Sequence, residues 1–107
     1  MTYDLLIIGG GPAGAAAAVY AARKQLHTAV ITDSFGGQSI VSPDIENWIG
    51  DKHISGEELA AKLESHVREY EGEEFGILSG QKVESLKQND DDSFTAITTK
   101  GTEYHGK

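Results

Sequence analysis

A glycine-rich turn between an apolar run and an alanine-rich run is the feature that most limits how this chain can fold. The apolar run occupies residues 3–8 (YDLLII) and is typical of a strand buried on both faces of a parallel sheet. Residues 13–24 are rich in alanine, the best helix former, and Pro12 suits the first turn of a helix. Residues 28–32 (TAVIT) form a second, β-branched run. A strand, a glycine turn, a helix and a strand in this order predict a βαβ unit.

The glycine turn has the pattern G-x-G-x-x-G at residues 9–14 (GGGPAG). The pattern alone is weak, but here it follows a predicted strand and opens a predicted helix, which is the context of a dinucleotide-binding turn. Gly9 allows the tight turn, Gly11 lets the backbone approach a pyrophosphate, and Gly14 lets helix and strand pack closely. Free amides at the helix start then face the phosphates at the positive end of the helix dipole. The turn therefore predicts a bound dinucleotide.

The end of the second run bears on which dinucleotide is bound. NAD-binding units usually end this strand in an acidic residue that holds the ribose hydroxyls. Here Thr32 stands at that place, and Asp33 comes one residue later. Asp33 either reaches the ribose or starts the turn, and both interpretations stay open.

A long connection separates this unit from the next predicted helix. It runs from residue 33 to about residue 54 and carries FGGQ at 35–38 and DIENWIG at 44–50. Loops beyond about 12–15 residues are usually functional or disordered, and the aromatic and apolar residues here argue against disorder. A helix is expected after Ser55, because Ser55 and Glu58 have the spacing of a capping box.

The remainder of the chain changes to short runs. A candidate third strand at residues 75–78 (FGIL) is followed by alternating or Thr- and Val-containing runs at 82–86, 93–99 and 102–105, which predict a small antiparallel meander. We therefore expect an α/β three-layer fold of Rossmann type, with a parallel sheet in strand order 3-2-1 and the β-meander attached.

Composition excludes several classes of function. The net charge of -8 argues against nucleic acid or an anionic membrane as a partner, because both would be repelled. The absence of cysteine removes any disulfide, thiolate metal site or dithiol redox centre from these residues. The 4 histidines are scattered without ligand spacing, so no metal site is predicted. No run approaches the roughly 20 apolar residues of a membrane span, and no signal peptide is visible, so a cytoplasmic location is expected.

Together these motifs resemble a known family. The segments YDLLIIGGGPAGAAAAVYAARK, ITDSFGGQ and DIENWIG are similar to thioredoxin reductases and to the flavoprotein subunit of alkyl hydroperoxide reductase. The resemblance is strong from Tyr3 to Ser65 and is one of pattern through the meander. A non-acidic residue at the position of Thr32 fits this family better than an NAD domain. The resemblance implies FAD as the cofactor and a homodimer in the parent family.

The resemblance also implies which residues would hold FAD. The glycine turn would hold the pyrophosphate and the end of the second strand the adenosine ribose. FGGQ would line the ribityl chain, DIEN would lie near the isoalloxazine, and the start of the meander would meet the adenine. In that order the expected cofactor-binding residues are Gly9, Gly11, Pro12, Ala13 and Gly14; Thr32 and Asp33; Gly36, Gly37 and Gln38; Ile45 and Asn47; and Val83. Trp48 is expected to pack, and no catalytic residue is expected.

Members of this family continue with a strand resembling ALIIATG, a nicotinamide-binding domain and a C-x-x-C, none of which is present here. We therefore expect residues 1–107 to be the N-terminal part of an FAD-binding domain, incomplete at its C-terminus, with a βαβαβ unit at 1–80 and the meander at 81–107. Electrons would pass from NAD(P)H through FAD to a disulfide or related acceptor only in a longer parent. A truncated sheet would expose an apolar edge, so marginal stability and self-association are expected.

Three alternatives stay beside this interpretation. A ferredoxin–NADP reductase-like flavoprotein would lack the dithiol, and a stand-alone nucleotide-binding module would have shed catalysis. A plain NAD-dependent dehydrogenase domain is the third, and the FGGQ and ENW elements count against it.

Overall fold

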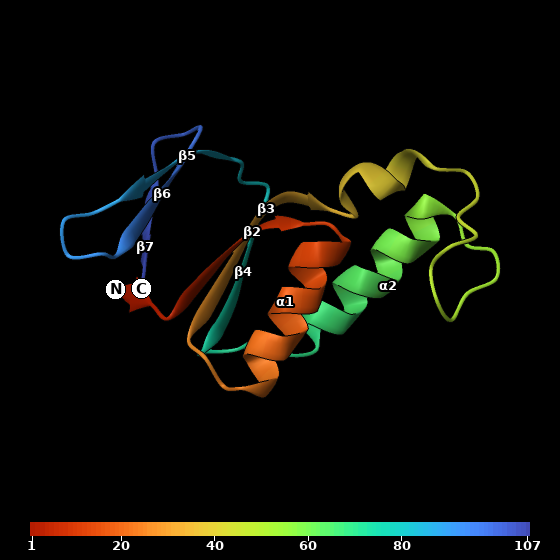
Figure 1. The fold of residues 1–107 in the computed structure, drawn as a ribbon, viewed down its shortest axis with the longest axis horizontal. Coiled ribbons are helices and arrows are strands. Elements are labelled where there is room, and N and C mark those ends of the chain that lie inside the picture. Colours follow the sequence, from red (N-terminus) through yellow and green to blue (C-terminus); the bar gives the residue numbers. More distant parts are fainter.

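Helices, a parallel sheet and a mixed sheet form three layers in the computed structural model, which describes residues 1–107 (Figure 1). Helices α1 (Pro12–Arg23) and α2 (Gly56–Arg68) cover one face of the parallel sheet. The mixed sheet lies against its other face, where Gly106 of the mixed sheet contacts Leu6. The three-layer α/β fold expected from the sequence is therefore confirmed.

The parallel sheet consists of β2 (Leu5–Gly10), β3 (Thr28–Phe35) and β4 (Phe75–Ser79), in the order β2-β3-β4. This is the 3-2-1 order that the sequence predicts. The central strand β3 is buried from Thr28 to Thr32, as a strand covered on both faces should be.

Helix α1 packs on this sheet through alanines. Ala15, Ala18 and Ala21 are buried at a spacing of three residues, so their small side chains let the helix lie close to Ile7 and Val30. The helix begins at Pro12 with Gly11 as its N-cap, within one residue of the expected start.

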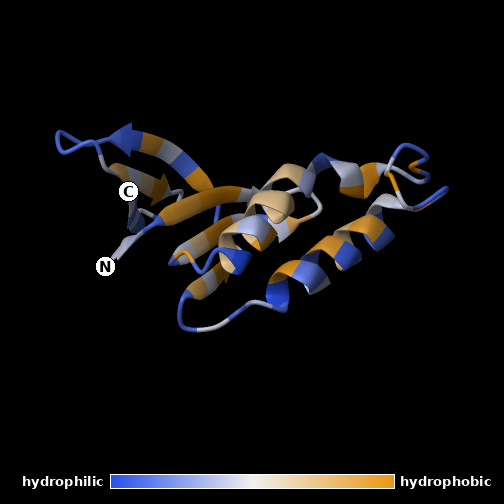
Figure 2. Cartoon of the chain, turned by 60° about the horizontal axis from the view of Figure 1, so that its bottom comes forward, coloured by the Kyte–Doolittle hydropathy of each residue, from blue (hydrophilic) through white to orange (hydrophobic).

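Helix α2 begins where the capping box predicts. Ser55 is the N-cap, and its Oγ accepts a hydrogen bond from the Glu58 backbone amide at 3.1 Å. Leu59 and Val67 are buried on the helix face that meets the sheet layer. Figure 2 shows this amphipathic pattern as a hydrophobic stripe along α2.

The connection between β3 and α2 is more ordered than the expected loop. Strand β3 continues to Phe35, and a 3-10 helix, η1 (Gly37–Val41), follows. Ile45 and Ile54 then form an isolated antiparallel bridge, with N–O distances of 2.7 and 3.0 Å. No sequence signal indicates this bridge, because a single residue pair has no periodicity.

The mixed sheet has the order β1-β7-β6-β5. Its bounds are β1 (Thr2–Tyr3), β5 (Val83–Gln88), β6 (Phe94–Thr98) and β7 (Glu103–Gly106). Strands β5, β6 and β7 form the antiparallel meander that the sequence predicts.

Strand β1 corrects the expectation of one continuous strand over residues 3–8. The run breaks at Asp4, whose Oδ2 accepts a hydrogen bond from the His27 backbone amide at 2.9 Å. The residues before the break pair in parallel with β7, with Tyr3 opposite Gly106. The second sheet is therefore mixed and not purely antiparallel.

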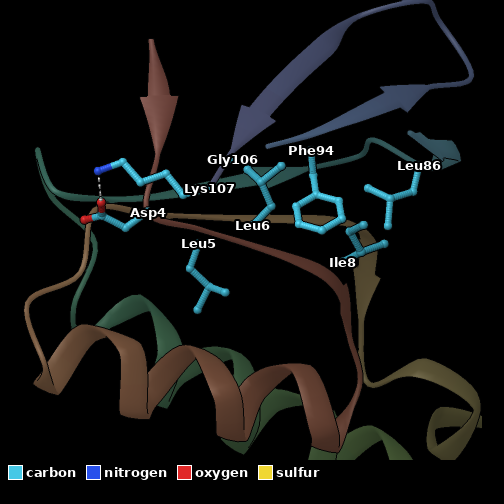
Figure 3. Close-up of a pocket in the computed structure, with 8 residues that line it drawn as sticks. All are labelled: Asp4, Leu5, Leu6, Ile8, Leu86, Phe94, Gly106 and Lys107. Carbon is cyan, nitrogen blue, oxygen red and sulfur yellow. Dashed lines mark hydrogen bonds and ion pairs between the residues drawn. The ribbon is translucent and has the colours of Figure 1, made fainter. Parts of the chain in front are cut away.

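An apolar pocket of about 280 Å³ remains between the two sheets, beside the edge of β2 that has no strand partner. Figure 3 shows Leu6 and Ile8 of β2 facing Leu86 and Phe94 of the meander across this space. Leu86 is 58% exposed, Ile8 is 45% exposed and Phe94 is 36% exposed. The seam between the sheets is thus incompletely filled.

We expect the isolated chain to self-associate through this seam and the free edge of β2, because both expose apolar surface. Leu86→Lys should shift the chain toward monomer in sedimentation velocity experiments at matched concentrations. Ile49→Lys is the control, since Ile49 is 95% exposed in the loop before α2 and lies outside the pocket. A wild-type chain that is monomeric and unfolds cooperatively without flavin would contradict the expectation.

Asp4 should make stability depend on pH. The hydrogen bond from the His27 amide, and then the one from the Lys107 ammonium at 3.0 Å, lower the pKa of the Asp4 carboxyl below its usual value. A lowered folded-state pKa gives stabilisation that is present above the unfolded pKa and is lost as pH falls through the folded one. Asp4→Asn should therefore be less stable than wild type at neutral pH, and the difference should shrink below about pH 4.

Urea unfolding at several pH values measures this difference. Asp90→Asn, in the exposed hairpin between β5 and β6, controls for the loss of one negative charge. A difference between Asp4→Asn and wild type that persists undiminished at low pH would show that the carboxylate is not responsible.

Candidate functional site

A groove of about 300 Å³ opens where β2 and β3 end. Ligands of open α/β sheets bind at the carboxyl ends of the strands, which is where this groove lies. Four segments line it: the end of β2 with the glycine turn, the end of β3, the start of η1, and the connection from β4 to the start of β5. The groove brings together these residues expected from the sequence: Gly9, Gly11, Thr32, Asp33, Gly37 and Val83.

The glycine turn has the geometry that its sequence predicts. Gly9 has a φ of +107°, a conformation that favours glycine. A Cβ at Gly14 would collide with the carbonyl oxygen of Gly9, so the close approach of helix and strand requires glycine at position 14. Glycine was expected at Gly9 for the turn and at Gly14 for packing, and the geometry agrees with both.

The amino end of α1 offers free hydrogen-bond donors. The first amide of the helix with a backbone acceptor is that of Ala15, which donates to the Gly11 carbonyl at 2.9 Å. The amides of Ala13 and Gly14 have no backbone acceptor, and no side chain caps the helix. These two donors lie at the positive end of the helix dipole, which favours an anionic group.

A second glycine turn packs against the first. Gly36 and Gly37 have φ values of +103° and +56°. The Gly36 amide donates to the Gly10 carbonyl at 2.9 Å, and a Cβ at Gly37 would lie 3.2 Å from the Cα of Gly11. Because neither turn carries a side chain at this contact, the groove stays open to a ligand along its backbone.

Thr32 and Asp33 differ in whether their side chains are free to bind a ligand in the groove. Thr32 is buried, and its Oγ1 donates to the Ser34 carbonyl at 2.7 Å, so its hydroxyl proton is already used. Asp33 is exposed and lines the groove. Strand β3 continues through Asp33, so this residue does not start the turn, and one of the two interpretations left open is wrong.

Most residues of the outer wall of the groove were not predicted from the sequence. Besides Val83, it contains Gln81 and Lys82, and Ser34 lines the groove from β3. No motif marks these residues in the sequence. Only the topology could have indicated them, because the segment that leaves β4 must pass the ends of the neighbouring parallel strands.

Several expected residues lie outside the groove. Gln38 is exposed on η1, Ile45 is occupied in its bridge with Ile54, and Asn47 is exposed in the loop that follows. Trp48 lines a different groove, of about 500 Å³, whose other lining residues belong to α1 and α2. The lining of the groove also lacks Pro12, Ala13, Gly14 and Gly36, so it contains only part of the set expected to hold the pyrophosphate and the ribityl chain.

One histidine does have acidic neighbours, contrary to the expectation of scattered histidines. The Ile45–Ile54 bridge brings His53 Nδ1 to 3.3 Å from Asp44 Oδ1 and 3.4 Å from Glu46 Oε1. All three side chains are more than half exposed, at 68%, 51% and 66%. Their ligand atoms lie within 4.8 Å of one another, so the set could hold a cation. Ion pairs this exposed contribute about 0–1 kcal/mol.

Comparison with known proteins gives consistent relatives. The family model described as "Pyridine nucleotide-disulphide oxidoreductase" matches residues 3–104. The chain is 44% identical over 88 residues to an NADH dehydrogenase of Bacillus subtilis, covering 82% of this chain and 17% of that protein. It is 46% identical over 81 residues to an alkyl hydroperoxide reductase component of Escherichia coli, covering 76% of this chain and 16% of that protein.

A solved structure extends the likeness to the fold. The thioredoxin reductase from Streptococcus pyogenes matches with a TM-score of 0.86 and 38% identity, over 99% of this chain and 33% of that chain. The chain thus spans a small part of each curated relative and about a third of the solved structure. Neither α1 nor α2 is long and apolar enough to cross a bilayer.

Gly14→Ala should destabilise the chain by about 1–3 kcal/mol, because the new Cβ would force apart the Gly9 carbonyl and the start of α1. The free energy of unfolding from urea titration measures this. Gly76→Ala in β4 is the matched control, since a Cβ there would meet no heavy atom within 4 Å. Equal stability of the two variants would show that the fold tolerates a side chain between residue 14 and the Gly9 carbonyl.

Proposed function

Because the chain belongs to the pyridine nucleotide-disulphide oxidoreductase family, we propose that residues 1–107 form the N-terminal part of an FAD-binding domain. In this proposal the groove at the ends of β2 and β3 holds the adenosine diphosphate part of FAD. The observation that carries it is the pair of unpaired amides at the start of α1, beside two glycine turns without side chains.

The pyrophosphate is assigned to the glycine turn. Its negative charge would be stabilised by the amides of Ala13 and Gly14 and by the dipole of α1. Gly9 and Gly11 leave room for the phosphate oxygens, and Pro12 starts the helix without an amide that would need a partner. The residues present therefore fit this part of the cofactor.

The adenosine is assigned to the outer part of the groove. The exposed Asp33 carboxylate can accept hydrogen bonds from ribose hydroxyls, whereas the Thr32 hydroxyl is already engaged. Val83 lies on the opposite wall, where its backbone would meet the adenine. Asp33 and Val83 thus keep the roles that the sequence predicts for them, as proposals.

The flavin part is assigned to Gly36, Gly37 and Gln38, with Ile45 and Asn47 near the isoalloxazine. Of these, only Gly37 shares the groove with the glycine turn. When bound, FAD would supply two-electron chemistry between a nicotinamide and a second acceptor. This chain's contribution is to bind the nucleotide and to orient it along the sheet edge.

The reaction of a longer parent is a further part of the proposal. The names of the family and of the relatives support transfer of electrons between a pyridine nucleotide and a disulfide or related acceptor, and FAD is our assignment for the carrier between them. The chain has no cysteine, so these residues supply no dithiol for such a step. Two alternatives stay open, a ferredoxin–NADP reductase-like parent and a stand-alone module. The homodimeric parent and the cytoplasmic location also stay predictions.

Titration of the purified chain with FAD, followed by flavin fluorescence and repeated with ADP as competitor, tests the proposal. We expect FAD binding that ADP displaces. Gly11→Ala should weaken FAD binding at least about tenfold, because its methyl group occupies the path of the pyrophosphate. Its fold should survive, because a Cβ at Gly11 would meet Gly37 at an ordinary 3.7 Å.

Gly76→Ala is again the matched control and should bind like wild type. A folded wild-type chain that binds neither FAD nor ADP would overturn the assignment of this groove. Equal affinity of Gly11→Ala and wild type would place the pyrophosphate elsewhere.

A further inference from the structure

We infer that Tyr104 is a positioning residue for the nucleotide groove, acting through Gln81 on the wall that faces the adenosine diphosphate half of the ligand. This inference rests on the proposed function of the groove. It adds a residue from the mixed sheet that lines no part of the groove itself.

The wall in question is residues 80–83, which are the connection between β4 and β5 and the first residue of β5, and it crosses from the parallel sheet to the mixed sheet. On the side of β3 it is held by two backbone hydrogen bonds. The Gly80 amide donates to the Asp33 carbonyl and the Gln81 amide donates to the Thr32 carbonyl, each at 3.1 Å. These bonds fix where the wall begins, but not where its side chains point.

On the side of the mixed sheet the wall has two other links. The Thr99 amide donates to the Lys82 carbonyl at 2.9 Å, and the Tyr104 hydroxyl donates to Gln81 Oε1 at 2.8 Å. Tyr104 lies in β7 opposite Ala96, which is fully buried, so its own position is set by the sheet. The tyrosine is thus a fixed anchor, and the glutamine is the group that it orients.

The meander that carries the far end of this wall is incompletely packed against β2, because an apolar pocket remains between them beside Leu86 and Phe94 (Figure 3). Hydrogen bonds therefore contribute more to holding the meander in place than they would if this pocket were filled. The bond from Tyr104 is one of these links, and it joins residues 23 positions apart in the chain.

The chemistry of the wall suits a nucleoside diphosphate. With Oε1 accepting from Tyr104, the Gln81 amide keeps its two N–H donors for other partners. Lys82 is the basic residue among those that line the groove, and it follows Gln81 directly. Without the tyrosine hydroxyl, Gln81 would regain rotamer freedom that a ligand must remove on binding.

Titration calorimetry with ADP tests the inference on the full chain. Tyr104→Phe removes only the hydroxyl and should weaken ADP binding roughly three- to tenfold, the effect of one hydrogen bond. Gln81→Met should weaken binding to a similar degree. In the Gln81→Met background, Tyr104→Phe should have no further effect, because the partner of the hydroxyl is already gone.

Tyr20→Phe is the matched control, since Tyr20 is 70% exposed on α1 and lies outside this groove. Urea unfolding of each variant shows that it is folded, and Gln81→Met gives an independent measurement if Tyr104→Phe is poorly folded. A Kd for ADP that is the same in Tyr104→Phe and wild type overturns the inference and leaves the proposed function standing. The inference is also overturned if Tyr104→Phe weakens ADP binding by the same factor in wild type and in Gln81→Met, because Tyr104 would then act through the packing of β7. Absence of ADP and FAD binding in wild type overturns both.

Discussion

The contact between the start of α1 and the end of β2 sets the geometry on which the rest of the structure depends. At this point a helix backbone and a strand backbone touch without an intervening side chain, because residue 14 has no Cβ to meet the Gly9 carbonyl. The buried alanines of α1 continue the same close approach along the sheet. The helix consequently starts beside the strand end, so its unpaired amides lie next to the glycine turn that lines the groove. Both the packing of the first layer and the anion-binding character of the site follow from that one steric condition.

The groove at the strand ends and the pocket between the sheets differ in polarity. This difference suits the groove to binding a ligand and the pocket to contact with another protein segment. The groove at the strand ends is lined mainly by glycines and polar residues, among them an acid, a base and an amide. The pocket between the sheets is lined mainly by leucine, isoleucine and phenylalanine. A polar ligand with phosphates suits the first, whereas the second offers only apolar surface, which favours another apolar segment. Alternate residues of β2 face the two sides, so one short strand serves both the helical core and this seam.

Local patterns in the sequence predicted the elements, whereas long-range pairings could not be predicted from them. Alanine content, Pro12 and the Ser55–Glu58 capping box placed the starts of both helices within a residue, because these signals act within one turn of backbone. The parallel order 3-2-1 followed from the connections alone. The break at Asp4 and the Ile45–Ile54 bridge could not be predicted, since each depends on a partner many residues away. For the groove, the glycine turns and Asp33 were accessible from motifs, whereas Gln81 and Lys82 line it only through the path of the chain. Gln38, Ile45 and Asn47, which were expected along the ribityl chain and near the isoalloxazine, lie outside this groove, and their roles stay predictions.

The parallel pairing of β1 with β7 joins Thr2 to His105 and places the two ends of the chain side by side (Figure 1). A contact of this sequence separation closes a loop of nearly the whole chain, which has a high entropic cost before any other pairing is made. Contacts inside the β2–α1–β3 unit are far more local and form without that cost. The chain should therefore build its helical side and glycine turn early and complete the mixed sheet late. The two chain ends should then be joined last, whereas the glycine turn and the contacts of the wall at residues 80–83 with β3 do not depend on that pairing.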